Sequence, residues 1–285
     1  MAFQIHDDEA CYEFDFSSEM DDLTEDEDEP ELLLSDEEED IPDKNEEETT
    51  STGAQSTSFE TSQPCTKRKG NLRVLSTNCD SLLNKKDELL ELAEQTQADI
   101  IAVTEVRPKS YTINPMETDF ILDGYSLHSN LDATIMRGVA IYIINDKSHL
   151  VTSIETNSGF QEQVWVKMHL KGNDSLIIGC LYRSGSGGTE NNDHLNQVIS
   201  QVSSQDPSHL LICGDFNYKG INWTDDTGTT REEEHFIECI RDNFLFQHVT
   251  EPTRYRAGHQ PSTLDLIPAQ AECIWHHWTA GSVAC

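Results

Sequence analysis

Hydrophobic residues form short runs in the part of the chain that begins near Leu72, whereas the preceding part is mainly polar. Runs rich in branched and aromatic residues predict strands. These runs cover residues 72–78, 98–105, 138–145, 163–170, 175–183, 209–215 and 262–267. Apolar residues at helical spacing predict helices at 85–95, 194–204 and 232–243.

This order of elements predicts an α/β fold. Several consecutive strands have no helix between them, so a single doubly wound sheet does not account for the pattern. Two packed mixed sheets flanked by helices cover the apolar faces better. We therefore expect a four-layer α/β-sandwich at residues 69–267, followed by a divergent C-terminal end at 268–285.

Charge changes the picture for the N-terminal part of the chain. Residues 1–60 hold 24 of the 53 acidic residues and one of the 19 Lys and Arg residues, which gives a net charge of 1 − 24 = −23. Like charges repel, and such runs bury too little apolar surface to offset the entropy of ordering. We expect a disordered acidic tail and Ser/Thr-rich linker at 1–68. Its apolar islands, around Tyr12 and at 32–34, are candidate docking segments for a protein partner, and a plain solvated tail is the alternative.

The remaining composition excludes several classes of protein. No apolar run approaches the roughly 20 residues that span a bilayer, and the N-terminus lacks the pattern of a secretory signal. We therefore expect an intracellular protein, nuclear or cytoplasmic, without a membrane partner. The eight cysteines are scattered and lie mostly in apolar runs, so we interpret them as reduced core residues. Trp165, with Glu162 before it, is also interpreted as core packing.

Isolated polar residues stand at the ends of the predicted strands, where protein scaffolds present reactive groups. They are Asn78, Asp80, Glu105, Asp215, Asn217 and Asp265. Carboxylate and amide oxygens are hard ligands, which Mg²⁺ and Mn²⁺ prefer. Without a cation, the carboxylates would repel one another and a phosphate substrate. The sequence therefore predicts a Mg²⁺ (or Mn²⁺) site that stabilises charge on a phosphodiester.

The motifs that carry these residues resemble those of a known superfamily. LSTNCDSL, IIAVTEV, RGVAIYI, IIGCLYR, LICGDFN and STLDLI follow one another as in the endonuclease/exonuclease/phosphatase superfamily. The resemblance is strongest to the endonuclease module of non-LTR retrotransposon proteins and to apurinic/apyrimidinic endonucleases. It implies a metal-dependent phosphodiesterase that acts on nucleic acid, with DNA as the expected substrate.

The resemblance also implies a role for each matching residue. Glu105 matches the principal metal ligand, and Asn78 and Asp80 match its neighbours in the metal site. Asp215 and Asn217 match the pair that positions the attacking water and the scissile phosphate. Tyr182 matches an aromatic hydroxyl that contacts the phosphate, and Arg183 is a further candidate phosphate contact. Asp265 matches a carboxylate that orients a catalytic histidine.

The expected histidine is missing from the pattern. The family continues to a Ser-Asp-His sequence, whereas this chain continues IPAQAECIWHHWTAGSVAC. We therefore expect the final strand of the family to be missing, an exposed sheet edge, and impaired catalysis, because a general base contributes about 10²–10⁴-fold in rate. His276 and His277 are not expected to replace it.

Several residues have a structural interpretation beside the functional one. Tyr182 also fits a strand aromatic at an interface, and Asn78 a helix cap. Glu105 fits a surface or capping residue, and the GDFN segment fits a turn. Asp265, without its histidine, fits an orphaned charge.

Three functional hypotheses follow. The first is an impaired, retroelement-derived endonuclease, which binds DNA weakly because the chain outside residues 1–60 still carries 18 − 29 = −11. The second is an inactive interaction protein that uses the acidic tail to dock on a partner. The third keeps the fold and the reaction but acts on a lipid or another phosphoester.

Overall fold

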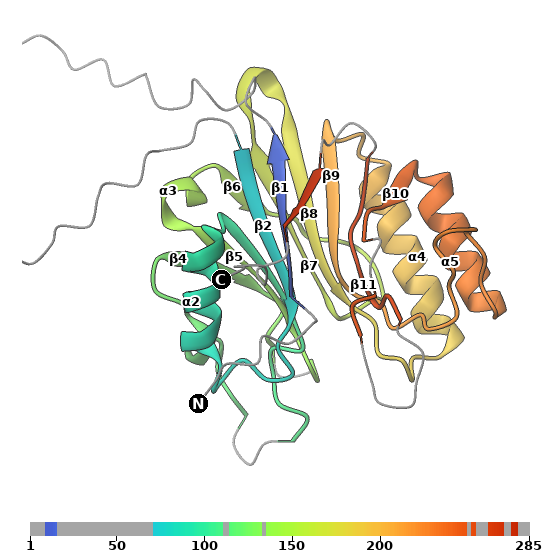
Figure 1. Cartoon of the computed structure of the whole chain (residues 1–285), viewed down its shortest axis with the longest axis horizontal. Coiled ribbons are helices and arrows are strands. Elements are labelled where there is room, and N and C mark those ends of the chain that lie inside the picture. Colours follow the sequence, from blue (N-terminus) through green and yellow to red (C-terminus); the bar gives the residue numbers. More distant parts are fainter. Residues whose placement is uncertain are drawn as a thin grey trace, which may run out of the picture.

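The computed structural model describes residues 9–15, 71–110, 114–132, 135–249, 252–254, 262–270 and 275–278. The predicted tail at 1–68 lies outside these residues except for 9–15. The predicted C-terminal end is described at 268–270 and 275–278. Within the described part, two sheets pack face to face between helices (Figure 1).

The first sheet has six strands in the order β13-β1-β2-β3-β5-β4. In chain order they are β1 (Glu9–Asp15), β2 (Asn71–Asn78), β3 (Ile100–Thr104), β4 (Tyr125–Ser129), β5 (Val139–Ile144) and β13 (Trp275–Trp278). β2 and β3 are parallel, and β5 is antiparallel to β3. The two parallel strands therefore end at the same edge of the sheet.

The second sheet has seven strands in the order β10-β12-β9-β8-β7-β6, with β11 pairing with β9. They are β6 (Val151–Ser153), β7 (Gln163–His169), β8 (Ser175–Tyr182), β9 (His209–Asp215), β10 (Leu245–Gln247), β11 (Asp265–Leu266) and β12 (Pro268–Gln270). β8 and β9 are parallel and side by side in full register. Their carboxyl ends meet in the same way as those of β2 and β3.

Helices connect the strands and cover the outer faces of the sheets. The α-helices are α2 (Lys86–Thr96), α3 (Asn145–Ser148), α4 (Thr189–Ser203) and α5 (Arg231–Asp242). Short 3-10 turns are η1 (Glu117–Phe120) and η2 (Lys171–Asn173). α2 connects the parallel pair β2 and β3, and α4 connects the parallel pair β8 and β9, as parallel strands require.

Three hydrophobic clusters hold the layers together. The first joins inner residues of both sheets, such as Val74 and Ile141 with Val166 and Ile178. The second packs the outer face of the second sheet against α4 and α5, and the third packs the outer face of the first sheet against α2. The predicted α/β-sandwich of two mixed sheets with flanking helices is thereby confirmed.

An unexpected strand comes from the acidic N-terminal segment. β1 pairs antiparallel with β2 from Glu9 opposite Thr77 to Asp15 opposite Asn71, and β13 pairs with the other side of β1. The edge of β2 that faces away from β3 is therefore covered by β1, and the absence of the family's final strand stays a prediction. His276 and His277 lie in β13, which β1 separates from β2.

The interpretation of the cysteines and of Trp165 is borne out where the structure describes them. Cys79, Cys180, Cys213 and Cys239 are buried and are not joined by disulfide bonds within the described part of the chain, and Trp165 is buried in the core. No helix in the described part of the chain is both long and apolar enough to cross a membrane.

Candidate active site

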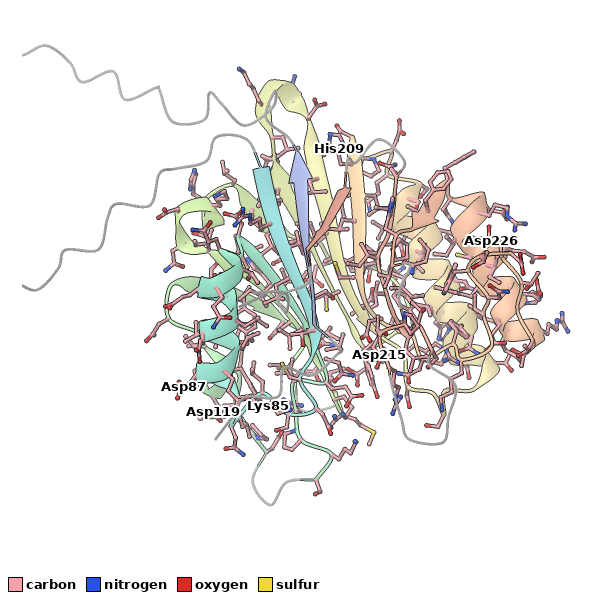
Figure 2. The ribbon with its side chains drawn as sticks, in the orientation of Figure 1. Lys85, Asp87, Asp119, His209, Asp215 and Asp226 are labelled. Carbon is pink, nitrogen blue, oxygen red and sulfur yellow. The ribbon has the colours of Figure 1, made fainter. Side chains whose placement is uncertain are left out.

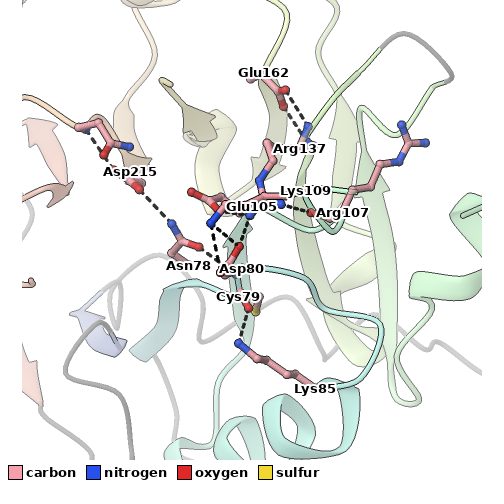
Figure 3. A network of polar contacts seen from close by, with 12 residues as sticks. Asn78, Cys79, Asp80, Lys85, Glu105, Arg107, Lys109, Arg137, Glu162 and Asp215 are labelled. Atoms are coloured by element: carbon pink, nitrogen blue, oxygen red, sulfur yellow. Dashed lines mark hydrogen bonds and ion pairs between the residues drawn. The ribbon is translucent and has the colours of Figure 1, made fainter. Parts of the chain in front are cut away.

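The predicted site residues gather where the two sheets meet at the carboxyl ends of their parallel strands. Asn78 ends β2, Glu105 directly follows β3, and Asp215 ends β9. The Nδ2 of Asn78 donates to Oδ2 of Asp215 at 2.9 Å, so one hydrogen bond joins the first sheet to the second (Figure 3). Tyr182 ends β8 directly opposite Asp215 in the strand register.

The loops after β2 and β3 continue side by side beyond the strands. The amide N of Ser81 donates to the carbonyl O of Glu105 at 2.8 Å, and the amide N of Leu82 donates to Val106 at 2.9 Å. These bonds hold the Asp80 loop against Glu105. The two carboxylates are therefore placed together by backbone structure and not only by their side chains.

The site residues also have uncommon backbone conformations. Asp80, Glu105 and Asn217 have φ values of 38°, 53° and 53°. Such left-handed conformations are sparse outside glycine and cluster at functional sites. Gly214, before Asp215, has a φ of 150°, and a Cβ there would lie 1.9 Å from the carbonyl O of Leu181. Only glycine fits this strand end.

Arg137 neutralises the acidic pair. One guanidinium nitrogen of Arg137 contacts Oε2 of Glu105 and lies 2.5 Å from Oδ1 of Asp80. The side chains of Arg137 and Glu105 are only 9% and 11% exposed, whereas that of Asp80 is 57% exposed. Lys109 adds a peripheral ion pair to Asp80 at 3.2 Å. These cations hold the pKa of Asp80 below its ordinary value, although burial opposes them.

The Arg137 loop is held from two sides. The carboxylate of Glu162 accepts hydrogen bonds from the amide N of Arg137 at 3.1 Å and of Gly138 at 2.7 Å. Burial raises the pKa of Glu162, while these backbone donors lower it. The guanidinium of Arg137 also donates to the carbonyl O of Arg107 at 2.6 Å. Glu162 is therefore a loop anchor, and its interpretation as core packing misses this role.

A second buried arginine shapes the same region. Arg107 is 1% exposed, and its guanidinium donates to the carbonyl oxygens of Leu131, Asp132 and Ile135. These bonds tie the loop before Arg137 to the strand end that carries Glu105. Neither Arg107 nor Arg137 was among the predicted site residues. For Arg137 a signal existed, because it is an isolated cation at the start of the RGVAIYI motif.

Asp215 is buried and fixed by two donors, the side chain of Asn78 and the amide N of Asn217 at 3.0 Å. Burial raises its pKa to about 7, against the hydrogen bond from Asn78, and the negative charge of Glu105 adds to the rise. Near neutral pH, Asp215 can therefore exchange a proton with a bound molecule. Asp265 lies directly opposite Asp215 in the β11–β9 pair.

Tyr182 is buried beside the acidic residues. Burial, the charge of Glu105 and a hydrogen bond to that carboxylate all raise the pKa of its hydroxyl. The phenol is therefore a protonated donor that contacts the candidate metal ligand. Its position supports a place in the site, and its contact with a phosphate stays a prediction.

Arg183 and Asn217 are tied to the second sheet. The guanidinium of Arg183 donates to Oδ1 of Asn192 at 2.7 Å and to the carbonyl O of Phe216 at 3.0 Å. It also stacks 3.8 Å from the ring centroid of Tyr218. Nδ2 of Asn217 donates to the carbonyl O of Arg183 at 3.1 Å. The guanidinium of Arg183 is thus already occupied by Asn192, Phe216 and Tyr218, and its contact with a phosphate stays a prediction.

The carboxylates of Asp80 and Glu105 are the candidate ligands for a divalent cation. No group of three or more His, Cys, Asp or Glu residues that could hold a metal is found among the described residues. Mg²⁺ nevertheless commonly binds through one or two carboxylates, with water and substrate phosphate as the other ligands. Asp80 and Glu105 both contact one cationic nitrogen of Arg137. They therefore face a common point and fit such a cation, with Arg137 as the present counter-ion.

Comparisons with known proteins agree with this architecture. Residues 176–282 match the family model described as endonuclease-reverse transcriptase, a match that runs past Ile267, where our predicted domain ends. A search of curated proteins finds no match to the chain.

Solved structures resemble the fold over most of its length. An AP endonuclease from Leishmania major has a TM-score of 0.53 at 12% identity, covering 70% of this chain and 78% of that chain. The endonuclease domain of TRAS1, a telomere-specific non-LTR retrotransposon, has a TM-score of 0.50 at 16% identity, covering 70% and 84%. The chain therefore has an endonuclease-like fold, and its resemblance to the endonuclease/exonuclease/phosphatase superfamily, inferred from its motifs, is confirmed.

Proposed function

We propose that the domain hydrolyses phosphodiester bonds of nucleic acid, with DNA as its substrate and with Mg²⁺ or Mn²⁺ as its cofactor. The observation that carries this proposal is the hydrogen bond between Asn78 and Asp215. It brings the Glu105 side of the site and the Asp215 side together at one edge of the two sheets (Figure 3). A divided site of this kind holds a phosphate between a cation and a proton acceptor.

Glu105 and Asp80 would hold the metal, which when bound neutralises charge on the phosphate and the leaving oxygen. Asp215 orients a water molecule and accepts its proton as the water oxygen forms a bond to phosphorus. The bond between phosphorus and the leaving sugar oxygen breaks at the same centre. Asn78 and Asn217 support this role, because their donors fix the direction of the Asp215 carboxylate.

The reaction is expected to be slow. Residues 268–285 contain no Ser-Asp-His sequence, so proton transfer falls to Asp215 in place of the usual histidine. The proposal that the domain descends from a retroelement endonuclease rests on the sequence motifs and on the likeness to the TRAS1 domain.

A nicking experiment tests the proposal. Purified protein with Mg²⁺ should convert supercoiled plasmid to open circles, and Asp215→Ala should lower the rate by about 100-fold or more. Asp226→Asn is the matched control, because Asp226 is exposed near α5 and far from Asp215 (Figure 2). Chelation of the metal should stop the reaction. Equal nicking by the wild type and Asp215→Ala would refute the proposed role of this site.

A second candidate function is a non-catalytic interaction protein. It is favoured by the ion pair of Arg137 with Glu105, which neutralises the principal candidate metal ligand, and by the net charge of −11 outside residues 1–60. In this case the acidic tail would bind a protein partner. Complete absence of both nicking and Mn²⁺ binding would favour it. Release of phosphate from small phosphoesters without plasmid nicking would instead favour the phosphatase alternative.

A further inference from the structure

The ion pair between Arg137 and two acidic residues has a consequence for the cation site. The contacts of Arg137 with Asp80 and Glu105 come from one nitrogen, so the guanidinium stands between both carboxylates (Figure 3). A divalent cation that used both carboxylates would need the same space and the same negative charge. Arg137 and the cation would therefore compete for this pair.

The surroundings of Arg137 favour an exchange rather than a permanent ion pair. The Nε of Arg137 is buried, and within the described part of the chain it has no hydrogen-bond partner. Buried donors are seldom left unsatisfied, and this nitrogen therefore adds no hydrogen bond that holds the side chain in its present position. The neighbouring Met136 is 75% exposed, which places the loop at the protein surface.

The backbone at Arg137 is anchored independently of the guanidinium. Glu162 accepts hydrogen bonds from the amides of Arg137 and Gly138, and both donors belong to the backbone. Rotation of the side chain away from the acidic pair would also break the hydrogen bond of the guanidinium to the carbonyl O of Arg107, but it would leave the backbone anchor of the loop in place.

We propose that Arg137 is an internal counter-ion that competes with the divalent cation for Asp80 and Glu105, so that metal binding requires Arg137 to withdraw. The inference rests on the proposed function, because it takes these two carboxylates as the metal ligands. It predicts weak metal binding by the wild-type chain and a specific gain when Arg137 is neutralised.

Mn²⁺ binding by the full chain tests the inference, with free Mn²⁺ measured by electron paramagnetic resonance. Arg137→Gln should bind Mn²⁺ roughly tenfold more tightly than the wild type, which corresponds to about 1.4 kcal/mol. Arg137→Lys keeps a positive charge and should stay near the wild-type affinity. Lys109→Gln is the matched control, because it removes one charge beside Asp80 but none beside Glu105. Its gain should be much smaller.

A second measurement covers the possibility that Arg137→Gln folds poorly, because two carboxylates then face each other without a cation. Mn²⁺ should then raise the Tm of this variant more than that of the wild type. Glu105→Gln should lose Mn²⁺ binding in either background. Equal Mn²⁺ affinity of the wild type and Arg137→Gln, with loss in Glu105→Gln, would refute the competition and leave the proposed metal site intact. Absence of binding in both would refute the competition and the metal site together.

Discussion

At the scale of single residues, the site contains acidic side chains that the fold places close together, and each of them has a partner that stabilises its negative charge. Asp215 accepts two hydrogen bonds, and Glu105 is paired with Arg137. The two carboxylates differ in their compensation. Glu105 is neutralised by a full positive charge, whereas Asp215 is held by neutral donors in a buried position. Asp215 is therefore the carboxylate whose protonation should change near neutral pH.

The raised pKa of Asp215 predicts a pH-dependent contribution to stability. Its folded-state pKa of about 7 lies above the unfolded value of about 3.9, so the folded chain binds the proton more tightly. The stabilising contribution is therefore full below pH about 4 and is lost as the pH rises through about 7. Asp215→Asn does not titrate. Its free energy of unfolding, relative to the wild type, should rise by roughly 1–3 kcal/mol between pH 5 and pH 8.

Urea unfolding of both chains at a series of pH values measures this difference. Asp226→Asn is the control, because it replaces an exposed carboxylate and retains Asp215, so its difference from the wild type should not show the change expected for Asp215→Asn. A constant difference for Asp215→Asn as well would show that burial does not perturb the proton affinity of Asp215.

Glu162 gives a second prediction at this scale. Its two carboxylate oxygens accept from two consecutive backbone amides, and a glutamine can satisfy only one of them with an oxygen. Glu162→Gln should lower the free energy of unfolding by roughly 1–3 kcal/mol, the usual cost of an unsatisfied buried group. Glu155→Gln, at an exposed position seven residues earlier, should change it by less than about 0.5 kcal/mol. Equal effects in denaturant titrations would remove Glu162 as the loop anchor.

At the scale of elements, the strength of the local pattern decided what the sequence could predict. β3 and β8 are continuous buried runs, and both were predicted. β4 was missed because its five residues, YSLHS, include only two large apolar side chains, which is too short a pattern to indicate a strand. α4 begins at Thr189, five residues before the predicted start, because its first turns are polar.

In the site, too, residues with a local sequence signal were predicted, whereas contacts that depend on tertiary packing were not. Glu105 and Asp215 were predicted because each follows an apolar strand, which is a local signal. The contact of Arg137 with Glu105 joins residues 32 positions apart, and the one between Asn78 and Asp215 joins residues 137 apart. Such pairs depend on the packing of whole elements, so the motifs indicated the acidic residues but not their counter-ion.

β1 supplies the prediction at this scale. It pairs on both sides, with β2 and with β13, so a proline within it removes a backbone donor from a central strand. Tyr12→Pro should lower the Tm by roughly 4–8 °C, the shift that about 2 kcal/mol produces in a domain of this size. Thermal unfolding followed by circular dichroism measures the shift, and light scattering should detect association through the exposed edge of β2.

A chain that lacks residues 21–55 is the matched control for this prediction. It loses much of the acidic tail but retains β1 and a linker to β2, so its Tm should stay close to that of the wild type. If Tyr12→Pro also left the Tm unchanged, β1 would not contribute to the stability of the domain.

At the scale of the whole molecule, charge opposes the proposed substrate. Residues 21–55 contain 17 acidic residues and Lys44, so their removal makes the net charge 16 units less negative. The tail and DNA are both negatively charged, and repulsion between exposed charges acts over about 10 Å at 0.1 M salt. We therefore expect the tail to weaken DNA binding by electrostatic repulsion. Removal of 21–55 should therefore tighten the binding of a labelled DNA duplex by roughly tenfold at low salt.

Fluorescence anisotropy at 50 mM and 200 mM salt separates electrostatic repulsion from exclusion of DNA by the bulk of the tail. Repulsion is screened, so the gain should shrink at the higher salt concentration. A chain of full length with the acidic residues of 21–40 changed to Asn and Gln should show most of the same gain, because it keeps the length of the tail. A gain in the deletion that is absent from this neutral chain would mean that the tail excludes DNA by its bulk, and the electrostatic explanation would be wrong.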